Sequence, residues 1–284
     1  MPDTSTIPIG FLNVVASPHP QGIYHNALQQ ASLEPVQYRG RDWAIIKPPS
    51  KSQSDTQIYE GQICVWTDVN PEEPSIDKTT FQEEIVGDNL KKVFEKQGFN
   101  NRTFSYALDE NTHKIAIELK NELGKTLSIH LAGKIFQKAL ERLNTGETTY
   151  EVTVQPTEDA LKNVLDLHRI DKISILLKRP NPGDHRGDDA EQILRELDDQ
   201  KLKSAVYQFN RQPGTDGIKL NSRNLTRASV AAENGNVQSS GLNENEQKVH
   251  RSTKEYPLVI QKIIDKATSH LIAIRDEVKR FRAT

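Results

Sequence analysis

The residues whose types and spacing could support catalysis are Glu118 and Lys120, together with the earlier Asp109. Residues two positions apart on a β-strand point to the same face, so Glu118 and Lys120 would lie side by side. In Mg²⁺-dependent nucleases, carboxylates hold the ion and a nearby lysine helps to activate water. The same spacing is also expected on the solvent-facing side of an amphipathic strand. The sequence therefore leaves a metal-dependent nuclease and an ordinary polar surface as alternatives.

A second group consists of basic residues in the second half of the chain, several of them in segments rich in Asn, Ser and Gly. Lys and Arg side chains neutralise phosphates, and short polar side chains with free backbone amides add phosphate contacts. The residues predicted to bind nucleic acid are Lys178, Arg179, Arg186, Arg211, Lys219, Arg223, Arg227, Lys248, Arg251 and Lys254. Tyr207 and Phe209 share one face of a predicted strand, where they could stack on bases or fill a core.

Charge is distributed unevenly along the 284 residues, although the formal net charge is only −2. Residues 61–100 contain 4 Lys/Arg against 8 Asp/Glu, a net charge of −4. Residues 201–284 contain 15 Lys/Arg against 8 Asp/Glu, a net charge of +7. A basic region is consistent with a polyanion-binding surface, whereas a pI near 6.5 is low for a dedicated DNA-binding domain. Lysines scattered over a solvated surface are the alternative.

Composition and missing motifs disfavour several classes of protein. The single cysteine, Cys64, excludes a disulfide framework and a cysteine-based zinc cluster, and the eight histidines lack metal-ligand spacing. The Walker A and G-x-G-x-x-G motifs of nucleotide binding and the G-x-S-x-G motif of serine hydrolases are also missing. With the histidine spacing, this leads us to expect no cofactor and no metal. No apolar run approaches the roughly 18 residues of a membrane span, and the first residues lack the features of a secretory signal. A cytoplasmic protein without a membrane segment is expected.

The periodicity of apolar residues predicts an α+β fold. Hydrophobic residues make up only 35% of the chain, so some segments should remain outside a packed core. We predict strands at 7–16, 36–48, 57–69, 148–156, 170–180 and 202–210, a hairpin at 102–120, and two or three short strands within 225–253. Helices are predicted at 22–33, 88–97, 127–143, 158–167 and 189–203, with an exposed acidic connection at 69–84.

These elements suggest two mixed sheet-plus-helix units and a separate C-terminal helix. The N-terminal α+β unit is assigned to 1–146. The second α+β unit is assigned to 147–256, and the order of its elements resembles a ferredoxin-like fold. A C-terminal oligomerisation helix is assigned to 257–284.

The C-terminal segment shows a heptad pattern. Apolar residues recur at alternating spacings of four and three, as in the seam of a coiled coil. The residues of this seam are Ile260, Ile264, Ala267, Leu271, Ile274, Val278 and Phe281. The pattern predicts a long helix that pairs with a second chain as a homodimer. Because Ile263 and Ile272 widen the apolar face, packing of the helix on its own domain stays an alternative.

Four stretches together resemble a bacterial family of unknown function whose members have about this length. They are GFLNVVASPHPQGIYHNAL, GQICVWTDVNPEEP, VTVQPTEDALKNVLDLHRIDKISILLKRPNPGD and GNVQSSGLNENEQKVHRSTKEYP. The resemblance implies a bacterial cytoplasmic protein from mobile or anti-phage loci. The two-unit layout also resembles prophage exclusion proteins of the RexA type, which are non-enzymatic DNA-binding dimers. Neither resemblance assigns a role to any residue.

The sequence thus favours a non-enzymatic homodimer that binds DNA with little sequence preference and acts in anti-phage defence. A partner-binding sensor or scaffold subunit, with a protein partner from the same locus, is the main alternative. The metal-dependent nuclease with Asp109, Glu118 and Lys120 is the third.

Overall fold

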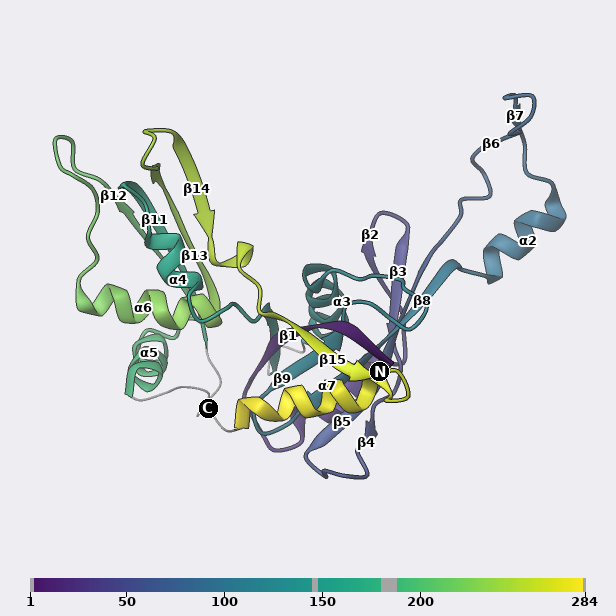
Figure 1. Ribbon diagram of the computed structural model, residues 1–284, viewed down its shortest axis with the longest axis horizontal. Helices are drawn as coiled ribbons and strands as arrows, with labels where there is room; N and C mark the ends of the chain where they lie inside the picture. Colours follow the sequence, from purple (N-terminus) through teal and green to yellow (C-terminus); the bar gives the residue numbers. More distant parts are fainter. Residues whose placement is uncertain (1–2, 145–147, 180–187, 283–284) are drawn as a thin grey trace.

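A computed structural model describes residues 3–144, 148–179 and 188–282. Within them lie fifteen strands and seven α-helices, which confirms the mixed α+β class (Figure 1). None of the helices in the described ranges combines the length and the apolar character needed to cross a bilayer. The structure has a large sheet, a smaller sheet beside it, and an arm, residues 69–97, that projects from the large sheet on the side away from the smaller one (Figure 1).

The large sheet is antiparallel and curled, with the order β10-β1-β9-β8-β5-β3-β2; β15 also pairs with β1, and β4 with β5. Its strands are β1 (Thr4–Ser17), β2 (Val36–Arg39), β3 (Asp42–Ile46), β4 (Ser50–Lys51), β5 (Ile58–Thr67), β8 (Phe99–Asp109), β9 (Lys114–Glu118), β10 (Thr149–Val154) and β15 (Val259–Asp265). The predicted hairpin is confirmed, because Tyr106 pairs with Ile117 and Leu108 with Ile115.

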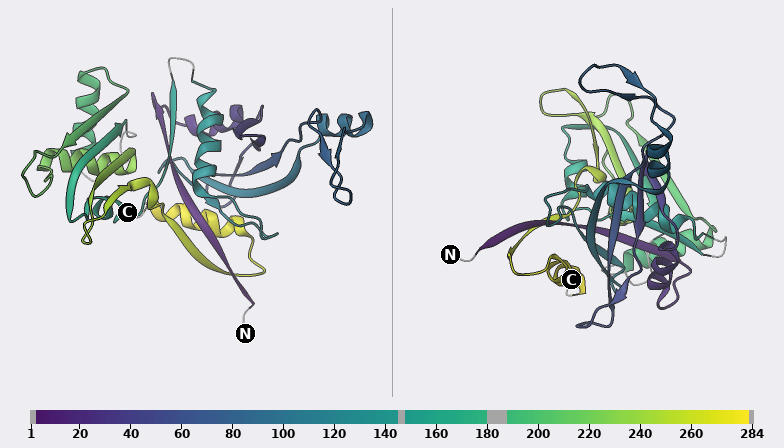
Figure 2. Two further views of the ribbon diagram at one scale, coloured as in Figure 1. Left: turned by 90° about the horizontal axis from the view of Figure 1, so that it is seen from above. Right: turned by 90° about the vertical axis from the view of Figure 1, so that its right-hand side faces the viewer.

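Helices cover both faces of the large sheet, which explains why its first strand is almost continuously apolar. Along β1, Leu12, Val14 and Ala16 face α1 (Ile23–Ala31) and α3 (Ile129–Glu141). The alternate residues Ile7, Ile9 and Phe11 face α7 (His270–Lys279). Figure 2 shows α1 and α7 on opposite sides of the sheet.

The predicted C-terminal coiled-coil helix is wrong. Ile260 and Ile264 lie in β15, which pairs with β1 through Ile9 and Ser5, and Ala267 lies in the turn that follows. The other seam residues, Leu271, Ile274, Val278 and Phe281, lie in α7 and in a 3-10 turn, η2 (Arg280–Arg282). Ile274 and Val278 are fully buried against the sheet of their own chain. The alternative of packing on the same domain is therefore the correct one for this segment.

The second unit is a four-stranded antiparallel sheet with the order β12-β11-β13-β14. Its elements are α4 (Ala160–Leu165), β11 (Arg169–Lys178), α5 (Asp188–Asp199), β12 (Ser204–Asn210), α6 (Ser222–Glu233), β13 (Gly235–Leu242), β14 (Lys248–Ser252) and a 3-10 turn, η1 (Thr253–Glu255). The ferredoxin-like order is not confirmed. The strand predicted at the start of 225–253 is instead helix α6, which begins after Asn221, whose side chain accepts a hydrogen bond from the amide of Asn224.

Two short segments join the units side by side. Pro156 and Pro257 form an antiparallel bridge, and the amide of Leu258 donates to the carbonyl of Gln155 at 2.7 Å. The second unit is thus inserted between β10 and β15, and both of these strands belong to the large sheet. The strand pairing places residues 149–154 and 259–282 with the first unit, whereas the sequence assigned them to other units.

We expect Gly235→Ala to destabilise the second unit. Gly235 begins β13 where its backbone passes β11 closely, and a Cβ there would lie 1.9 Å from the carbonyl oxygen of Leu176. Because that oxygen is part of the backbone, the strands must separate, at a cost of about 1–3 kcal/mol. Urea unfolding would measure the loss. Gly214→Ala, in a turn with no atom within 4 Å of the new Cβ but with φ +82°, is the comparison for backbone strain alone.

Candidate functional site: a cationic cavity and a projecting arm

The three residues of the nuclease hypothesis do not converge. Asp109 and Glu118 lie at opposite ends of the β8–β9 hairpin, because Asp109 is opposite Lys114, four residues before Glu118. At about 3.3 Å per residue they are roughly 13 Å apart, too far to share one ion. Lys120 is exposed and lies beyond the end of β9. Among the described residues no group of three or more His, Cys, Asp or Glu side chains is arranged to hold a metal.

Both carboxylates instead bind groups of the C-terminal segment. Glu118 lies 2.6 Å from Nδ1 of His270 and accepts a hydrogen bond from the Ser105 amide, also at 2.6 Å. Asp109, which is fully buried, forms an ion pair with Arg282. The alternative of a solvated polar face is therefore also wrong for these two residues, since they hold α7 and η2 on the sheet.

Much of the positive charge of residues 201–284 is neutralised in the same way. Arg282 and Lys279 lie near Asp55, at 2.7 and 3.8 Å. Further pairs in this segment are Arg275–Glu60 at 3.3 Å, Lys262–Glu277 at 2.6 Å, Arg280–Glu277 at 2.9 Å and Lys266–Asp3 at 2.6 Å. The net charge of +7 is therefore not a measure of exposed cationic surface.

Most of the basic residues predicted to bind nucleic acid also have protein partners. Arg223 and Arg227 pair with Glu196, Arg211 with Asp171, Arg179 with Asp198, Lys178 with Glu151, and Arg251 donates to the carbonyls of Asn163 and Asp166. Lys219, Lys248 and Lys254 are exposed and have no ion pair among the described residues, whereas Arg186 lies outside them. Tyr207 and Phe209 pack against the core of the second unit, and the guanidinium of Arg227 lies 4.2 Å from the centroid of the Tyr207 ring.

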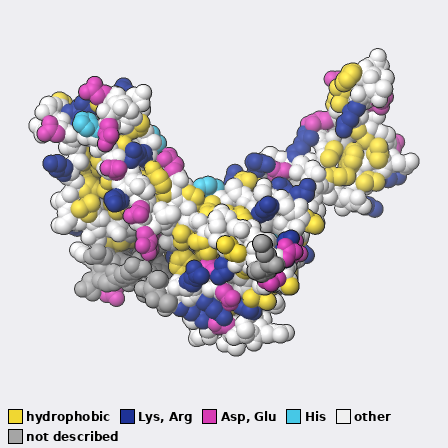
Figure 3. Space-filling view, in the orientation of Figure 1, with side chains coloured by type: hydrophobic (Ala, Val, Ile, Leu, Met, Phe, Trp, Pro, Cys, Tyr) yellow, Lys and Arg dark blue, Asp and Glu magenta, His cyan; other side chains and the backbone are white. Residues whose placement is uncertain are grey.

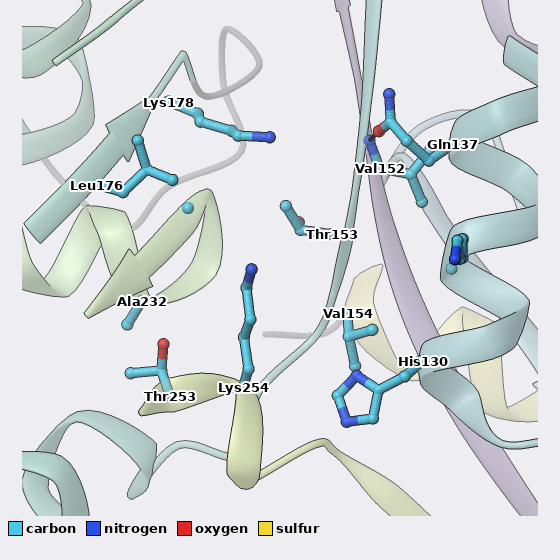
Figure 4. A pocket seen from close by; sticks show the side chains of 13 residues that line it. His130, Gln137, Val152, Thr153, Val154, Leu176, Lys178, Ala232, Thr253 and Lys254 are labelled. Atoms are coloured by element: carbon cyan, nitrogen blue, oxygen red, sulfur yellow. Dashed lines mark hydrogen bonds between the residues drawn. The ribbon is translucent and has the colours of Figure 1, made fainter. Parts of the chain in front are cut away.

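Two of the predicted residues, Lys178 and Lys254, meet residues of the first unit around a cavity of about 260 Å³. The cavity lies between α3 and β10 on one side and the ends of β11, α6 and η1 on the other. Figure 4 shows Lys178 and Lys254 extending from the second unit toward Thr153, with His130 and Gln137 on the opposite wall. Lys134 of α3 also lines the cavity and was missed, because its position on an exposed helix face gives no signal of a site.

Hydrogen bonds within the protein fix the walls of this cavity. The side chain of Gln137 accepts a hydrogen bond from the Val152 amide at 2.6 Å, which ties α3 to β10. The hydroxyl of Thr153 donates to the carbonyl of Glu233 at 3.1 Å, and the side-chain amide of Asn13 donates to that of Asn234 at 2.8 Å. These last two bonds connect the units, so the cavity is held from both sides.

One carboxylate lies beside the cavity and is shared by two lysines. Glu151 is 2.6 Å from the ammonium of Lys178 and 3.2 Å from that of Lys203. Burial acts to raise the pKa of Glu151, but the hydrogen bonds and charges of the two lysines outweigh it, so its pKa lies below the ordinary value. Glu151 is therefore ionised at neutral pH and compensates only one of the two positive charges.

A second candidate surface is the arm, which we define as residues 69–97. It contains β6 (Ser75–Ile76), β7 (Glu83–Glu84) and α2 (Asp88–Lys96), and Figure 3 shows hydrophobic side chains gathered on it. Its exposed large hydrophobic residues are Val69, Ile76, Phe81, Ile85, Leu90 and Val93, of which Ile85 is 87% and Phe81 76% exposed. The sequence predicted an exposed connection and a short helix here, but not an apolar surface.

The base of the arm is well anchored. A Cβ on Gly98 would lie 1.8 Å from the ring of Trp66, so the chain leaves the arm packed directly on that indole. The indole N–H donates to Asp68 at 2.9 Å, and Arg41, next to β3, forms an ion pair with Glu73 of the arm. The arm therefore leaves the sheet in a defined direction.

Comparison with known protein families finds a match over nearly the whole chain. A family model described as a domain of unknown function, DUF4747, matches residues 5–280. No curated protein matches the chain.

Proposed function

The chain belongs to the DUF4747 family of domains of unknown function, and we propose that it is a self-associating binding protein whose arm docks on the arm of a second copy. The observation that carries this proposal is the set of six large hydrophobic side chains exposed on the arm. Clustered apolar side chains on a projecting element are typical of protein interaction surfaces.

The secondary structure of the arm also supports a docked state. Helix α2 has nine residues, none of them buried, and isolated helices shorter than about 12–15 residues are marginal in water. The β6–β7 hairpin pairs only two residues on each side, and a lone two-stranded hairpin is likewise marginal. A partner surface would supply the packing that both elements lack.

A second copy of the chain fits this surface by charge as well as by polarity. Leu90, Val93 and Phe94 form one apolar stripe of α2, at spacings of three and four residues. Asp88 lies in the first turn of the helix and Lys96 in the last. Two such helices packed antiparallel about a two-fold axis would bring each Asp88 near the partner's Lys96. A two-fold interface needs only one self-complementary patch, and the arm provides it.

We expect the wild-type chain to form a dimer of twice its 32.1 kDa mass, and Leu90→Asp/Val93→Asp to be monomeric. A buried, unpaired carboxylate in the apolar contact costs more than a small interface supplies. Light scattering coupled to size-exclusion chromatography measures the mass. Leu123→Asp, at a site 83% exposed outside the arm, is the matched control and should remain dimeric.

A charge exchange tests the antiparallel arrangement. Asp88→Lys places like charges opposite each other and should weaken the dimer, whereas Asp88→Lys/Lys96→Asp should restore it. A monomeric wild type at every concentration would overturn self-association and leave the arm to a different protein. A dimer that survives in the Leu90→Asp/Val93→Asp variant would place the interface elsewhere and refute the proposal for the arm.

DNA binding and a role in anti-phage defence stay predictions. The ion pairs of Arg223, Arg227 and Arg211 make a broad cationic face on the second unit less favourable than it looked from the sequence. Support for an anion ligand comes instead from the cavity between the units.

A further inference from the structure

We propose that the cavity between the two units binds phosphate groups, either those of a free nucleotide or those of a nucleic-acid strand. This site goes beyond the proposed self-association and does not depend on it. The cavity is lined by three lysines, Lys134, Lys178 and Lys254, and by His130. None of the described residues that line it is Asp or Glu.

The cations come from separate elements that the fold brings together. Lys134 and His130 project from α3 of the first unit, one helical turn apart. Lys178 ends β11 and Lys254 lies in η1, both in the second unit. Like charges repel one another, so holding several lysines around one cavity is unfavourable. An anion bound between them would offset that repulsion.

The neutral polar side chains that line the cavity already form hydrogen bonds within the protein, so the lysines are the donors available to a ligand. Gln137, Thr153 and Thr253 all bond to groups of the protein. Lys134 and Lys254 have no ion pair with any described residue, and Lys178 shares Glu151 with Lys203. Ammonium groups bind phosphate oxygens as compact point charges, and phosphates contribute several acceptor oxygens each.

The dimensions fit a phosphate-bearing group rather than a large apolar ligand. A volume of about 260 Å³ lies just below the roughly 300–1,000 Å³ of drug-sized ligand pockets. An adjoining hollow of about 40 Å³ shares Lys178 and is lined also by Arg179, Lys203 and the carboxylate Glu151, so it carries more positive than negative charge. A nucleotide would occupy the main cavity alone, whereas a strand would continue past Lys178 along the junction.

The test uses the full chain with two kinds of probe. Anisotropy of a short labelled DNA strand, over a salt series from about 50 mM, measures strand binding. Calorimetric titration with inorganic phosphate, pyrophosphate and ATP measures free phosphates. In Lys134→Glu/Lys254→Glu we expect binding to weaken about tenfold or more. For a strand the salt slope should also fall by about 1.4, because each phosphate of a single strand that a lysine neutralises contributes about 0.7 to it.

The control carries the same change of charge at Lys125→Glu/Lys172→Glu, exposed positions, one in each unit, that lie outside the cavity lining and outside the predicted nucleic-acid-binding set. It should bind within about twofold of the wild type. Strand binding without ATP binding identifies a nucleic-acid site, and the reverse identifies a nucleotide site. If no probe binds at low salt, or if the control loses as much affinity as the cavity variant, the proposal fails. The mass of the dimer, measured in parallel, reports on the arm separately.

Discussion

Replacing Ile274 with Ala is expected to lower the free energy of unfolding by about 2–5 kcal/mol, without changing the mass of the protein in solution. Ile274 is fully buried between α7 and the sheet, where it packs with Ile9, Phe11 and Ile58. Truncation removes most of its buried side chain and leaves a cavity in a small apolar layer. Denaturant unfolding followed by circular dichroism would give the change.

The same helix provides a matched control. Ile272 is 42% exposed on the outer side of α7, so Ile272→Ala should change stability by less than about 0.5 kcal/mol. A coiled coil through this segment predicts a different pair of results. In that case Ile274→Ala would dissociate a dimer and leave the folded units intact. Equal effects at the two positions would contradict the packing of α7 on its own sheet.

A second large effect is expected for Arg282→Ala, which leaves Asp109 buried without its charge partner. Arg282 also binds Asp55, so one side chain joins two carboxylates and fixes the end of α7. Removing one member of a buried ion pair costs about 3–5 kcal/mol, and the lower end applies because Arg282 itself is partly exposed. Thermal unfolding would measure the loss. Arg280→Ala, two residues earlier and more exposed, should cost clearly less.

The pH dependence of stability provides an independent check on this cluster. Burial acts to raise the pKa of Asp55, but hydrogen bonds from Arg282 and the Gln57 amide, with the charge of Lys279, hold it below its ordinary value. The ionised carboxylate therefore contributes stability above the ordinary pKa of about 3.9, and this contribution is lost as the pH falls through the lower folded value. In Asp55→Asn this acid-dependent part should be missing. If Asp55→Asn lost stability at acid pH just as the wild type does, this role of Asp55 would be contradicted.

The parts of the fold that the sequence predicted correctly are those with one unambiguous period. The run from Ile7 to Ala16 is apolar on both faces and forms a central strand covered by helices on both sides. The alternation of Phe104, Tyr106 and Leu108 predicted the hairpin, and the apolar residues spaced four apart within 127–143 predicted α3. Which of these side chains are buried follows from the spacing of apolar residues within a single element, and that spacing can be read from the sequence.

The C-terminal segment shows why a period can mislead. Ile260 and Ile264 are four residues apart, a spacing that puts two side chains on one face of a helix and equally on one face of a strand. The break between strand and helix was marked by Ser269, whose hydroxyl accepts a hydrogen bond from the Leu271 amide at the start of α7. Because the heptad pattern runs across this helix start, it predicted one long helix where the structure has a strand followed by a helix.

The candidate site depended on pairings that no local pattern records. Arg282 neutralises Asp109 across most of the chain length, and Lys178 meets Glu151 across the junction of the two units. A net charge summed over a stretch of sequence therefore includes residues whose charge is neutralised by a distant partner. Lys134 joins the cavity only because α3 and η1 form opposite walls of it, a consequence of inserting the second unit into the first.

That insertion also bears on the order in which the protein can fold during synthesis. Strand β1 emerges from the ribosome early, but β15, its neighbour along Thr4–Gly10, is made only after the whole second unit. At about 5–20 residues per second, the roughly 240 residues between the two strands take about 12–50 seconds to synthesise. The inserted unit has its own core and can fold in that interval, whereas the large sheet keeps an unpaired edge until the last segment arrives. The nascent chain is therefore most exposed to aggregation along β1, and a chaperone that binds extended apolar segments would act there.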